Sequence, residues 1–496
     1  MRNQVQLITY ADRLGGSFPA LTALLSGPLS GLFGGVHVLP FFDPIDGADA
    51  GFDPRDHREV DPRLGSWHDV EALGTVAPLM ADLIVNHVSV DSPQFQDFLA
   101  HGERSTYAGM FLTLDKVFPE GANEADLLAI YRPRPGLPLT PVTLADRTRR
   151  IVWTTFTPSQ IDIDVRDPTS RAYLDAILDR FAAHNIRMVR LDAVGYAVKT
   201  AGTSSFMTAD TFAFIGELTA RAHQRGIEIL VEVHSHWRTQ VEIAGQVDWV
   251  YDFALPPLVL HALFSGSADR LRRWCEIRPR NAVTVLDTHD GIGVIDVGPD
   301  SSEVAHLGLL DAREIDELVE GIHEHSHGAS RLATGAAASN VDLYQVNSTY
   351  FDALGADERA YLLARMIQLV LPGVPQIYYV GLLAGHNDVE LLHRTGVGRD
   401  INRHHYTDDE VEAALRRPVV QRLKALIRLR NDHPAFDGTW ELLPGEGAEL
   451  GMRWTNGEHD LTLRADFAAR SFLLAYSEAG GTRQVADLAD LIEQPS

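Results

Sequence analysis

Eight short runs of apolar and β-branched residues recur along the chain, and segments with helical periodicity separate many of them. Several runs are almost continuously apolar, which is typical of strands covered on both faces. Amphipathic patterns at 170–185, 208–226 and 357–371 continue this alternation, which produces parallel strands joined by crossover helices. Eight such units predict an α/β fold, a (β/α)8 TIM barrel, with a doubly wound sheet as the alternative. The runs are VQLITYA (5–11), GGVHVLPFF (34–42), ADLIVNHV (81–88), MVRLDAV (188–194), IEILVEVH (227–234), WVYDFAL (249–255), AVTVLDTHD (282–290) and VPQIYYVG (374–381).

Two intervals are too long to be simple loops between barrel elements. Residues 86–165 follow the third strand without a clear strand–helix unit, and residues 291–355 follow the seventh. Structureless loops longer than about 15 residues are uncommon, so we expect two inserted domains. Short alternating strands predict a small C-terminal β domain at 436–496. The barrel is then expected to comprise 1–85, 166–290 and 356–435.

Charge and cysteine usage restrict the partners and the compartment. A formal net charge of −25 argues against nucleic acid and anionic membranes, because both require a basic surface. The single cysteine, Cys275, excludes an intramolecular disulfide and fits a reducing compartment. We see no secretory signal at the start of the chain and no run that approaches the roughly 18 apolar residues of a membrane span. We therefore expect a cytoplasmic protein.

The stretch MVRLDAVGY (188–196) places two charged residues inside a strand that otherwise reads as buried. Arg190 and Asp192 are two apart, so both side chains leave the same face of an extended chain. Charged residues are almost never fully buried unless they are paired. A structural ion pair is one explanation for this pattern, and a catalytic site is the other.

Other predicted strands also end in polar residues, which favours the catalytic explanation. In a (β/α)8 barrel the catalytic groups come from the carboxyl ends of several strands. Three carboxylates at three strand ends of one rim are hard to explain as devices for stability alone. The residues at these ends are Asn86 and His87, Arg190 and Asp192, Glu232 and His234, and His289 and Asp290.

Three carboxylates at one rim suit the hydrolysis or transfer of glycosides. One carboxylate attacks the anomeric carbon while a second, about 5–5.5 Å away, protonates the leaving oxygen. Arg190 is expected to lower the pKa of Asp192 and keep it ionised. Burial and neighbouring carboxylates can keep a proton on Glu232, so it suits the general acid. Asp290 would remain ionised and stabilise the positive charge of the transition state.

The motifs ADLIVNHV, VRLDAV, VEVH and DTHD resemble, in order and spacing, the four characteristic regions of the α-amylase family of retaining glycosidases, glycoside hydrolase family 13. By this resemblance Asp192 is the nucleophile, Glu232 the general acid/base and Asp290 the transition-state stabiliser. Longer stretches, among them LPFFDPIDGADAGFDPRDH, IYRPRPGLP, SNVDLYQVNSTY and GRDINRH, are similar to the sucrose phosphorylases of that family. One departure from the amylases agrees with this, because Gly195 and Tyr196 stand where amylases usually carry Lys-His.

The resemblance to sucrose phosphorylases also implies the substrate-binding residues. It assigns Arg134 to phosphate, and it implies a mobile VDLYQ loop that offers Leu343 and Tyr344 to phosphate or Asp342 and Gln345 to fructose. It places Tyr196 and His234 near the acceptor. The glucosyl pocket implied by the resemblance consists of Asp49, Phe52, His87, Arg190, His289 and Arg399.

These residues predict an enzyme, a glycosyltransferase that carries out the reversible phosphorolysis of sucrose to α-glucose 1-phosphate and fructose. Phosphate must compete with far more concentrated water, and IYRPRPGLP offers Arg132 and Arg134 between prolines as an anion site in an acidic chain. We expect sucrose, inorganic phosphate, glucose 1-phosphate and fructose as ligands, with no cofactor and no metal. Relatives suggest a homodimer.

Several alternatives remain open at this point. The same fold could act on sucrose 6′-phosphate or glucosylglycerol, or it could be a sucrose hydrolase or transglucosidase. A non-catalytic amylase-like partner of a membrane transporter is a further alternative, although the three carboxylates are retained. Calcium at Asn86, which matches a ligand position in amylases, and a metal at the HEHSHG run (323–328) are the metal alternatives that we weighed.

Overall fold

The structure is a computed structural model that describes residues 1–47, 49–132, 134–299, 307–334 and 345–492. Eight parallel strands close into a barrel in the order β1, β2, β5, β10, β11, β12, β13 and β16, with β16 pairing back to β1. Each strand overlaps one of the eight predicted runs, although β5 and β10 begin two residues earlier than predicted. The barrel is therefore confirmed and the doubly wound sheet is wrong. The strands are β1 (Gln6–Thr9), β2 (Gly35–Val38), β5 (Leu79–Ile84), β10 (Ile186–Asp192), β11 (Glu228–Val231), β12 (Trp249–Asp252), β13 (Ala282–Thr284) and β16 (Val374–Tyr378).

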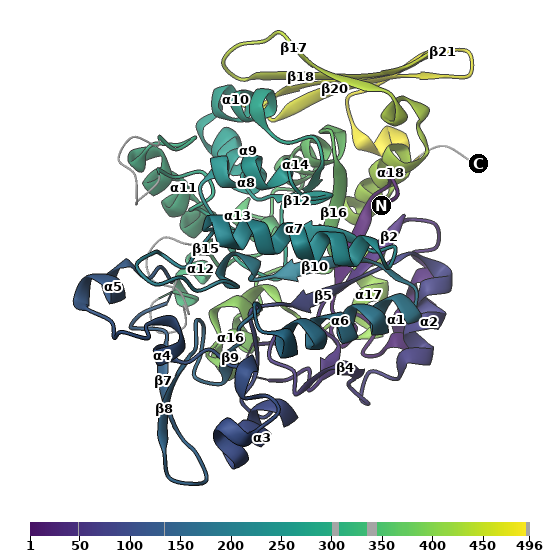
Figure 1. Cartoon of the computed structure of the whole chain (residues 1–496). Helices are drawn as coiled ribbons and strands as arrows, with labels where there is room; N and C mark the ends of the chain where they lie inside the picture. Colours follow the sequence, from purple (N-terminus) through teal and green to yellow (C-terminus); the bar gives the residue numbers. More distant parts are fainter. Residues whose placement is uncertain (48, 133, 300–306, 335–344, 493–496) are drawn as a thin grey trace.

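Helices follow the strands and cover the outside of the barrel (Figure 1). The three helices predicted from amphipathic periodicity are present as α6, α7 and α14. The helices that connect or flank the barrel strands are α1 (Phe18–Ser26), α2 (Trp67–Val76), α6 (Pro168–Ala183), α7 (Ala209–His223), α8 (Trp237–Ala244), α9 (Leu255–Ser265), α10 (Asp269–Ile277), α14 (Glu358–Val370), α15 (Tyr379–Leu382), α16 (Val389–Thr395), α17 (Asp408–Leu415) and α18 (Pro418–Asp432).

Strand β10 shows how the alternation of side chains builds the site. Val189 and Leu191 are buried in the large core cluster that includes helix residues. Met188 belongs instead to a second cluster formed with side chains of β5, β11, β12 and β13. Because alternate residues of a strand share a face, Arg190 and Asp192 continue the column that Met188 begins inside the barrel. The charged pair therefore lies on the inner face, at the carboxyl end of the strand.

The segment after β5 forms its own small structure. Strand β6 (His87–Ser89) pairs antiparallel with β9 (Gln160–Asp162), and β7 (Leu139–Thr143) forms a hairpin with β8 (Arg149–Trp153) that projects from the molecule in Figure 1. A separate apolar cluster packs Trp153 against Leu112, Val117 and Phe118. The division at 86–165 itself stays a prediction. The helices of this segment are α3 (Pro93–His101), α4 (Leu114–Val117) and α5 (Glu124–Ala129).

The segment after β13 contains a two-stranded sheet. Strand β14 (Ile292–Gly293) pairs antiparallel with β15 (Gln345–Val346). Helices α11 (Ala312–His325), α12 (Ala329–Leu332) and α13 (Tyr350–Ala353) belong to the same segment. Part of the predicted insertion at 291–355, residues 300–306 and 335–344, lies outside the described residues, and its boundaries stay a prediction.

A five-stranded antiparallel sheet follows the last barrel helix and lies at one end of the molecule (Figure 1). It confirms the expected C-terminal β domain, although its last strand was not predicted. The indole of Trp454 donates to the carbonyl of Val370 at 2.6 Å and so ties this sheet to α14. The strands are β17 (Thr439–Leu443), β18 (Glu449–Asn456), β19 (His459–Asp466), β20 (Ser471–Glu478) and β21 (Gly481–Val485).

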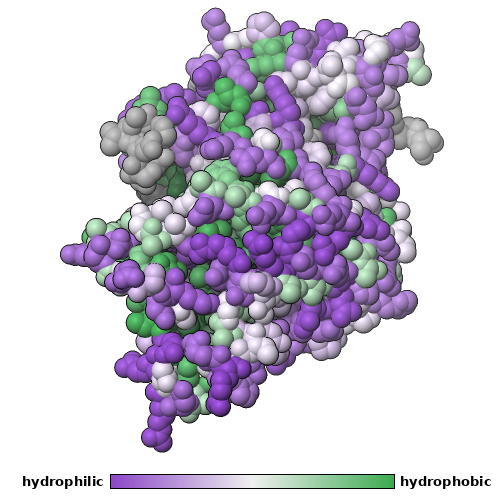
Figure 2. Space-filling view, in the orientation of Figure 1, coloured by the Kyte–Doolittle hydropathy of each residue, from purple (hydrophilic) through white to green (hydrophobic). Residues whose placement is uncertain are grey.

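One face of the molecule shows how polar and apolar side chains are distributed on its surface. The face drawn in Figure 2 is mostly hydrophilic, and its apolar residues form small separate groups. Among the described residues, we find no helix with both the length and the apolar character that crossing a membrane requires.

Candidate active site

One pocket collects residues that are far apart in the sequence. It lies at the carboxyl ends of the barrel strands, where Asp192 ends β10. Twelve of the predicted site residues line it, and Arg190 lies directly beneath. Asp342, Leu343 and Tyr344 are outside the described residues. The twelve are Asp49, Phe52, His87, Arg134, Asp192, Tyr196, Glu232, His234, His289, Asp290, Gln345 and Arg399.

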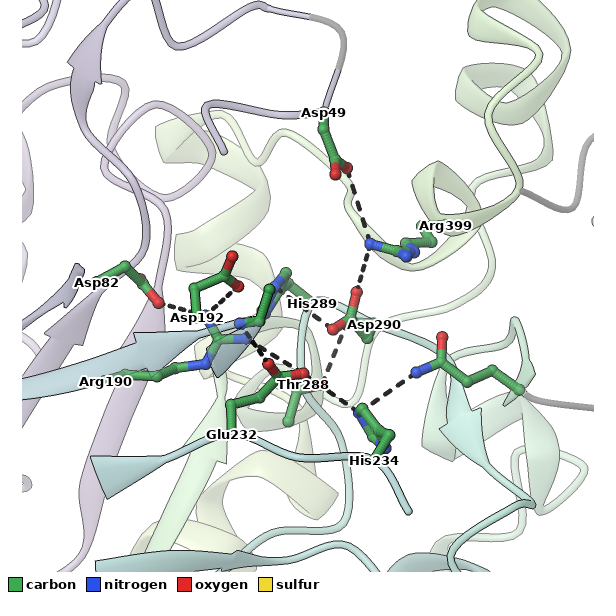
Figure 3. A network of polar contacts seen from close by, with 12 residues as sticks. Asp49, Asp82, Arg190, Asp192, Glu232, His234, Thr288, His289, Asp290 and Arg399 are labelled. Atoms are coloured by element: carbon green, nitrogen blue, oxygen red, sulfur yellow. Dashed lines mark hydrogen bonds and ion pairs between the residues drawn. The ribbon is translucent and has the colours of Figure 1, made fainter. Parts of the chain in front are cut away.

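Arg190 and Asp192 form the ion pair that their spacing predicts. The Nη1 atom of Arg190 donates to Oδ1 of Asp192 at 3.1 Å, and both side chains are buried (Figure 3). The same Nη1 atom makes a second, short contact with Oδ1 of Asp82 on β5. Arg190 therefore serves two carboxylates at once.

The pKa of Asp192 is raised, whereas the sequence led us to expect that it would be lowered. Burial raises the pKa of Asp192 above its ordinary range, and the nearby carboxylates of Glu232, Asp82 and Asp49 raise it further. Arg190 lowers this pKa, as expected, but does not outweigh the other contributions. The sequence revealed Arg190 as a neighbour of Asp192, but it could not show that the fold brings three further carboxylates close to Asp192.

Glu232 lies just beyond the end of β11 and faces the nucleophile candidate. Its Oε2 accepts a hydrogen bond from the backbone N–H of Ala193 at 3.1 Å, and its Oε1 is 3.8 Å from Nη2 of Arg190. Ala193 has a φ of 52°, a left-handed conformation that costs an L-residue about 1–2 kcal/mol. This conformation turns the chain immediately after Asp192 and aims the Ala193 N–H at Glu232.

Asp290 is held in the ionised form by arginines. Its Oδ1 is 2.8 Å from Nη1 of Arg399 and 3.7 Å from Nη2 of Arg403. Although burial opposes ionisation, Arg399, His289 and Arg403 lower the pKa of Asp290 well below its usual range. Arg399 also lies 3.7 Å from Oδ1 of Asp49, so it is closer to Asp290 than to Asp49.

Phe52 and two histidines form one wall of the pocket. The rings of Phe52 and His289 stack with centroids 5.0 Å apart. Burial lowers the pKa of both His87 and His289, so each is neutral near pH 7. The Nε2 of His87 is 2.9 Å from the carbonyl of Phe52 and donates to it. These neutral rings suit hydrogen bonds to sugar hydroxyls.

His234 is oriented by a buried carboxylate that the sequence did not reveal. Its Nδ1 lies 2.9 Å from Oδ2 of Asp296, and its Nε2 lies 3.3 Å from Nε2 of Gln345. Burial opposes protonation, but Asp296 raises the pKa of His234 above its ordinary value. The second oxygen of Asp296 accepts from Gln240 at 2.8 Å. The imidazole therefore presents Nε2 toward Gln345 in the pocket.

The two arginines of the IYRPRPGLP stretch have different places. Arg134 lines the pocket, whereas Arg132 is not among its lining residues and donates to the carbonyl of Phe156 at 3.1 Å. The Arg134 guanidinium lies over the Phe156 ring at 5.7 Å. Burial and the neighbouring Arg399 lower the pKa of Arg134. Two partly desolvated guanidinium groups on one pocket favour an anionic ligand.

Sequence reasoning missed several residues of the site. Phe156 and Phe206 line the pocket, with ring centroids 5.3 and 4.6 Å from that of Tyr196. Asp82 carried a signal, because it is a charged residue within the apolar run ADLIVNHV. Asp296 carried none, because it lies 62 residues from His234 in a loop.

A lysine contacts Asn86, the residue at which we considered a calcium ion. The Nζ of Lys199 donates to Oδ1 of Asn86 at 2.7 Å, lies 2.6 Å from Asp162 Oδ2 and also contacts the carbonyl of Tyr196. An ammonium group thus takes the oxygen ligands that a calcium ion would need, and we discard this alternative.

Two other groups bear on the metal question. In HEHSHG, His323 bonds Ser330 and His325 bonds the Gly321 carbonyl, so both rings are engaged separately. Glu232, His234 and Asp290 offer ligand atoms within 4.8 Å of one another, a spacing that could hold a metal ion. The arginines bound to Asp290 disfavour a divalent cation there.

The family of the chain follows from the fold, the site and the sequence together. The sequence matches the family described as "Alpha amylase, catalytic domain" over residues 32–420. The chain belongs to the α-amylase family.

Within that family its close relatives are phosphorylases. It is 61% identical over 455 residues to a sucrose phosphorylase of Agrobacterium vitis, and these residues make up 92% of this chain and 93% of the relative. It is 55% identical over 464 residues to a sucrose phosphorylase of Bifidobacterium adolescentis, with 93% and 92% covered. A solved sucrose 6F-phosphate phosphorylase from Thermoanaerobacter thermosaccharolyticum has a TM-score of 0.90 and 37% identity, with 98% of each chain covered. The resemblance to sucrose phosphorylases noted in the sequence is confirmed.

Proposed function

We propose that this chain is a glycosyltransferase that converts sucrose and inorganic phosphate reversibly into α-glucose 1-phosphate and fructose. The observation that carries the proposal is the convergence of Asp192, Glu232 and Asp290, from three barrel strands or the loops after them, on one pocket that Arg134 also lines. The high identity to two sucrose phosphorylases over more than nine-tenths of the chain supports the choice of substrate.

In the first half of the reaction Asp192 attacks the anomeric carbon of the glucosyl unit. Its carboxylate oxygen forms a bond to that carbon while the bond to the fructose oxygen breaks, and Glu232 gives its proton to that oxygen. Asp290 lies ionised beside the reacting sugar, where its charge stabilises the positive charge of the transition state. The products are fructose and a β-glucosyl ester of Asp192.

In the second half phosphate replaces water as the attacking group. Glu232, now a carboxylate, takes a proton from phosphate, whose oxygen bonds to the anomeric carbon as the bond to Asp192 breaks. Water is about 55 M, so millimolar phosphate needs roughly a 10⁴-fold advantage, or about 5.5 kcal/mol. Arg134 supplies part of that advantage as a preorganised phosphate-binding group, and Arg399 adds positive charge beside it.

The acceptor side of the pocket must serve fructose and phosphate in turn. Tyr196, His234 and Gln345 line it, and His234 carries a raised pKa that favours a protonated, phosphate-binding form. We assign Asp342 and Gln345 to fructose, and Leu343 and Tyr344 to phosphate. Asp49, Phe52, His87, Arg190, His289 and Arg399 are assigned to the glucosyl unit.

Product analysis with and without phosphate tests this proposal. Purified enzyme is incubated with sucrose, and glucose 1-phosphate, fructose and free glucose are quantified. Glucose 1-phosphate with little free glucose is the expected result. Free glucose in excess despite saturating phosphate would identify a hydrolase instead.

A second candidate substrate comes from the solved neighbour. The sucrose 6F-phosphate phosphorylase shares the whole architecture at a TM-score of 0.90, so the acceptor could carry a phosphate group. The same assay with sucrose 6′-phosphate and with glucosylglycerol decides among these acceptors by comparing kcat/KM.

We further propose a cytoplasmic homodimer. The cytoplasmic location is supported by the one cysteine, Cys275, which is free and buried. Light scattering on the eluting peak of a sizing column should give twice 54.7 kDa. A monomer mass at micromolar concentration would contradict the dimer.

A further inference from the structure

A buried carboxylate outside the pocket, Asp82, contacts the same arginine as Asp192 and Glu232. Asp82 on β5 is the cross-strand partner of Arg190 on β10, and Figure 3 shows it on the opposite side of the guanidinium from Glu232. Arg190 Nη1 contacts Asp82 Oδ1 and is 3.1 Å from Asp192 Oδ1. Asp82 is 0% exposed and is not among the residues that line the pocket. It therefore acts through Arg190 rather than on the substrate.

The proposed reaction, on which this inference rests, moves negative charge across Arg190. Asp192 loses its charge when the ester forms, and Glu232 gains one when it gives up its proton. Arg190 cannot lose its proton, and it is 3.1 Å from Asp192 but 3.8 Å from Glu232. Attraction falls with distance, so an arginine serving only these two groups would oppose ester formation.

We propose that Asp82 is a positioning residue that occupies part of the hydrogen-bonding capacity and charge of Arg190, and thereby limits how strongly Arg190 holds the ionised Asp192. Asp192 is then a better nucleophile, and its glucosyl ester is a poorer leaving group. The covalent intermediate persists for phosphate to reach it. Asp82 thus sets the balance between the two half-reactions.

His37 on β2 moderates Asp82 from the other side. Its Nε2 lies 3.0 Å from Asp82 Oδ2, and both side chains are 0% exposed. The N–H of His37 stabilises the charge of Asp82 and competes with Arg190 for it. Tyr251 lies 3.4 Å from the other ring nitrogen and donates to Gln376 at 2.9 Å, which fixes the position of the ring.

The charged groups that act on Asp192 define the test. They are Arg190, which lowers the pKa of Asp192, and Glu232, Asp82 and Asp49, which raise it together with burial. Removing the charge of Asp82 leaves Arg190 with Asp192 at 3.1 Å and the more distant Glu232 at 3.8 Å. The acidic limb of the pH profile of kcat/KM for sucrose should therefore move to lower pH, by about one unit.

The decisive variant is Asp82→Asn. Rapid quench gives the rate of the fructose burst, a phosphate chase gives the rate of ester breakdown, and mass spectrometry of quenched enzyme gives the occupied fraction of Asp192. In Asp82→Asn we expect the burst to slow about tenfold, the chase to become faster and the occupied fraction to fall. A purely structural role would slow both steps or reduce the active fraction, and would leave the acidic limb in place.

Two further variants complete the design. Asp252→Asn removes another fully buried carboxylate partner of an arginine, Arg278 at 2.7 Å, and should lower the melting temperature without changing the balance of the two steps. His37→Phe keeps a ring and removes the donor to Asp82, so the acidic limb should move upward, opposite to Asp82→Asn. This variant keeps the inference testable if Asp82→Asn does not fold.

The outcomes separate this inference from the proposed function. A wild-type enzyme that forms no ester on Asp192 overturns the proposed function. A wild-type enzyme that forms the ester, together with unchanged partitioning and pH limb in Asp82→Asn, overturns only the role of Asp82. If the acidic limb of the pH profile moves to lower pH or does not move in His37→Phe, the role of Asp82 is also overturned.

Discussion

The three carboxylates of the pocket have different surroundings, and these surroundings suit different tasks. Asp290 lies against Arg399 and Arg403, which keep its pKa low. Asp192 shares one arginine with Asp82 and is buried, so its pKa is raised. Glu232 has a backbone N–H and the distant edge of Arg190 as neighbours. The same side-chain chemistry therefore meets three different environments, of which that of Asp290 suits a permanent charge.

Replacing the general acid should affect only substrates that need it. In Glu232→Gln the side chain keeps its size but cannot protonate the fructose oxygen, so kcat/KM for sucrose should fall by about 10²–10⁴-fold. Glucosyl fluoride has a leaving group that needs no acid, and its first step should be nearly unchanged. Equal losses with both donors, measured by initial rates of fructose and fluoride release, would contradict the role of Glu232.

The two arginines of one loop provide a matched pair for the phosphate site. Loss of a charged hydrogen bond costs about 1.5–3 kcal/mol, so Arg134→Ala should raise the KM for phosphate about tenfold to a hundredfold. The KM for sucrose should change far less. Arg132→Ala, a change of the same kind outside the pocket lining, is the control and should leave both constants near wild type. If both variants change the two constants alike, the phosphate site lies elsewhere.

At the scale of the elements, the sequence predicted the barrel correctly, but not every catalytic residue lies at the end of a strand as expected. Each of the eight runs overlaps one barrel strand because apolar, β-branched runs in a parallel sheet are buried on both faces. Asp192 ends β10, but β11 ends at Val231 and β13 at Thr284, so Glu232 and Asp290 lie in loops beyond the strands. Loop geometry depends on tertiary contacts, which also explains why Asp296 could not be predicted. The site residues were predictable because their motifs are local.

Lys199 joins the barrel to the segment inserted after β5. Lys199 lies in the loop after β10, and its buried Nζ contacts Asn86, two residues beyond β5, and Asp162 on β9. In Lys199→Met a buried carboxylate loses its cation, which costs about 3–5 kcal/mol, so the melting temperature should fall clearly in calorimetry. Because an ammonium takes the place of a calcium ion, EDTA should leave the melting temperature of the wild type unchanged. A large decrease with EDTA would show that a metal contributes here.

At the scale of the whole molecule, paired polar groups follow the apolar cluster of the barrel interior toward the carboxyl ends of the strands. His57 on β4 (Asp56–Val60) and His37 both bond to Asp82, one to its backbone carbonyl at 3.0 Å and one to its side chain. Asp82 in turn holds Arg190. The ring of His57 itself packs against Phe42 and Phe181. Its protonation should therefore affect stability.

His57 makes the stability of the molecule depend on pH. Burial lowers its pKa to about 4, against 6.5 for the free side chain. Between these values the unfolded chain binds a proton that the folded chain does not, so stability falls as pH falls through this window. From pH 7 to pH 4.5 the loss from this one group is about 2 kcal/mol. His57→Gln cannot titrate, so its free energy of unfolding, measured by denaturant titration at both pH values, should decrease by about 2 kcal/mol less than that of the wild type. An identical decrease in both proteins would mean that folding does not lower the pKa of His57.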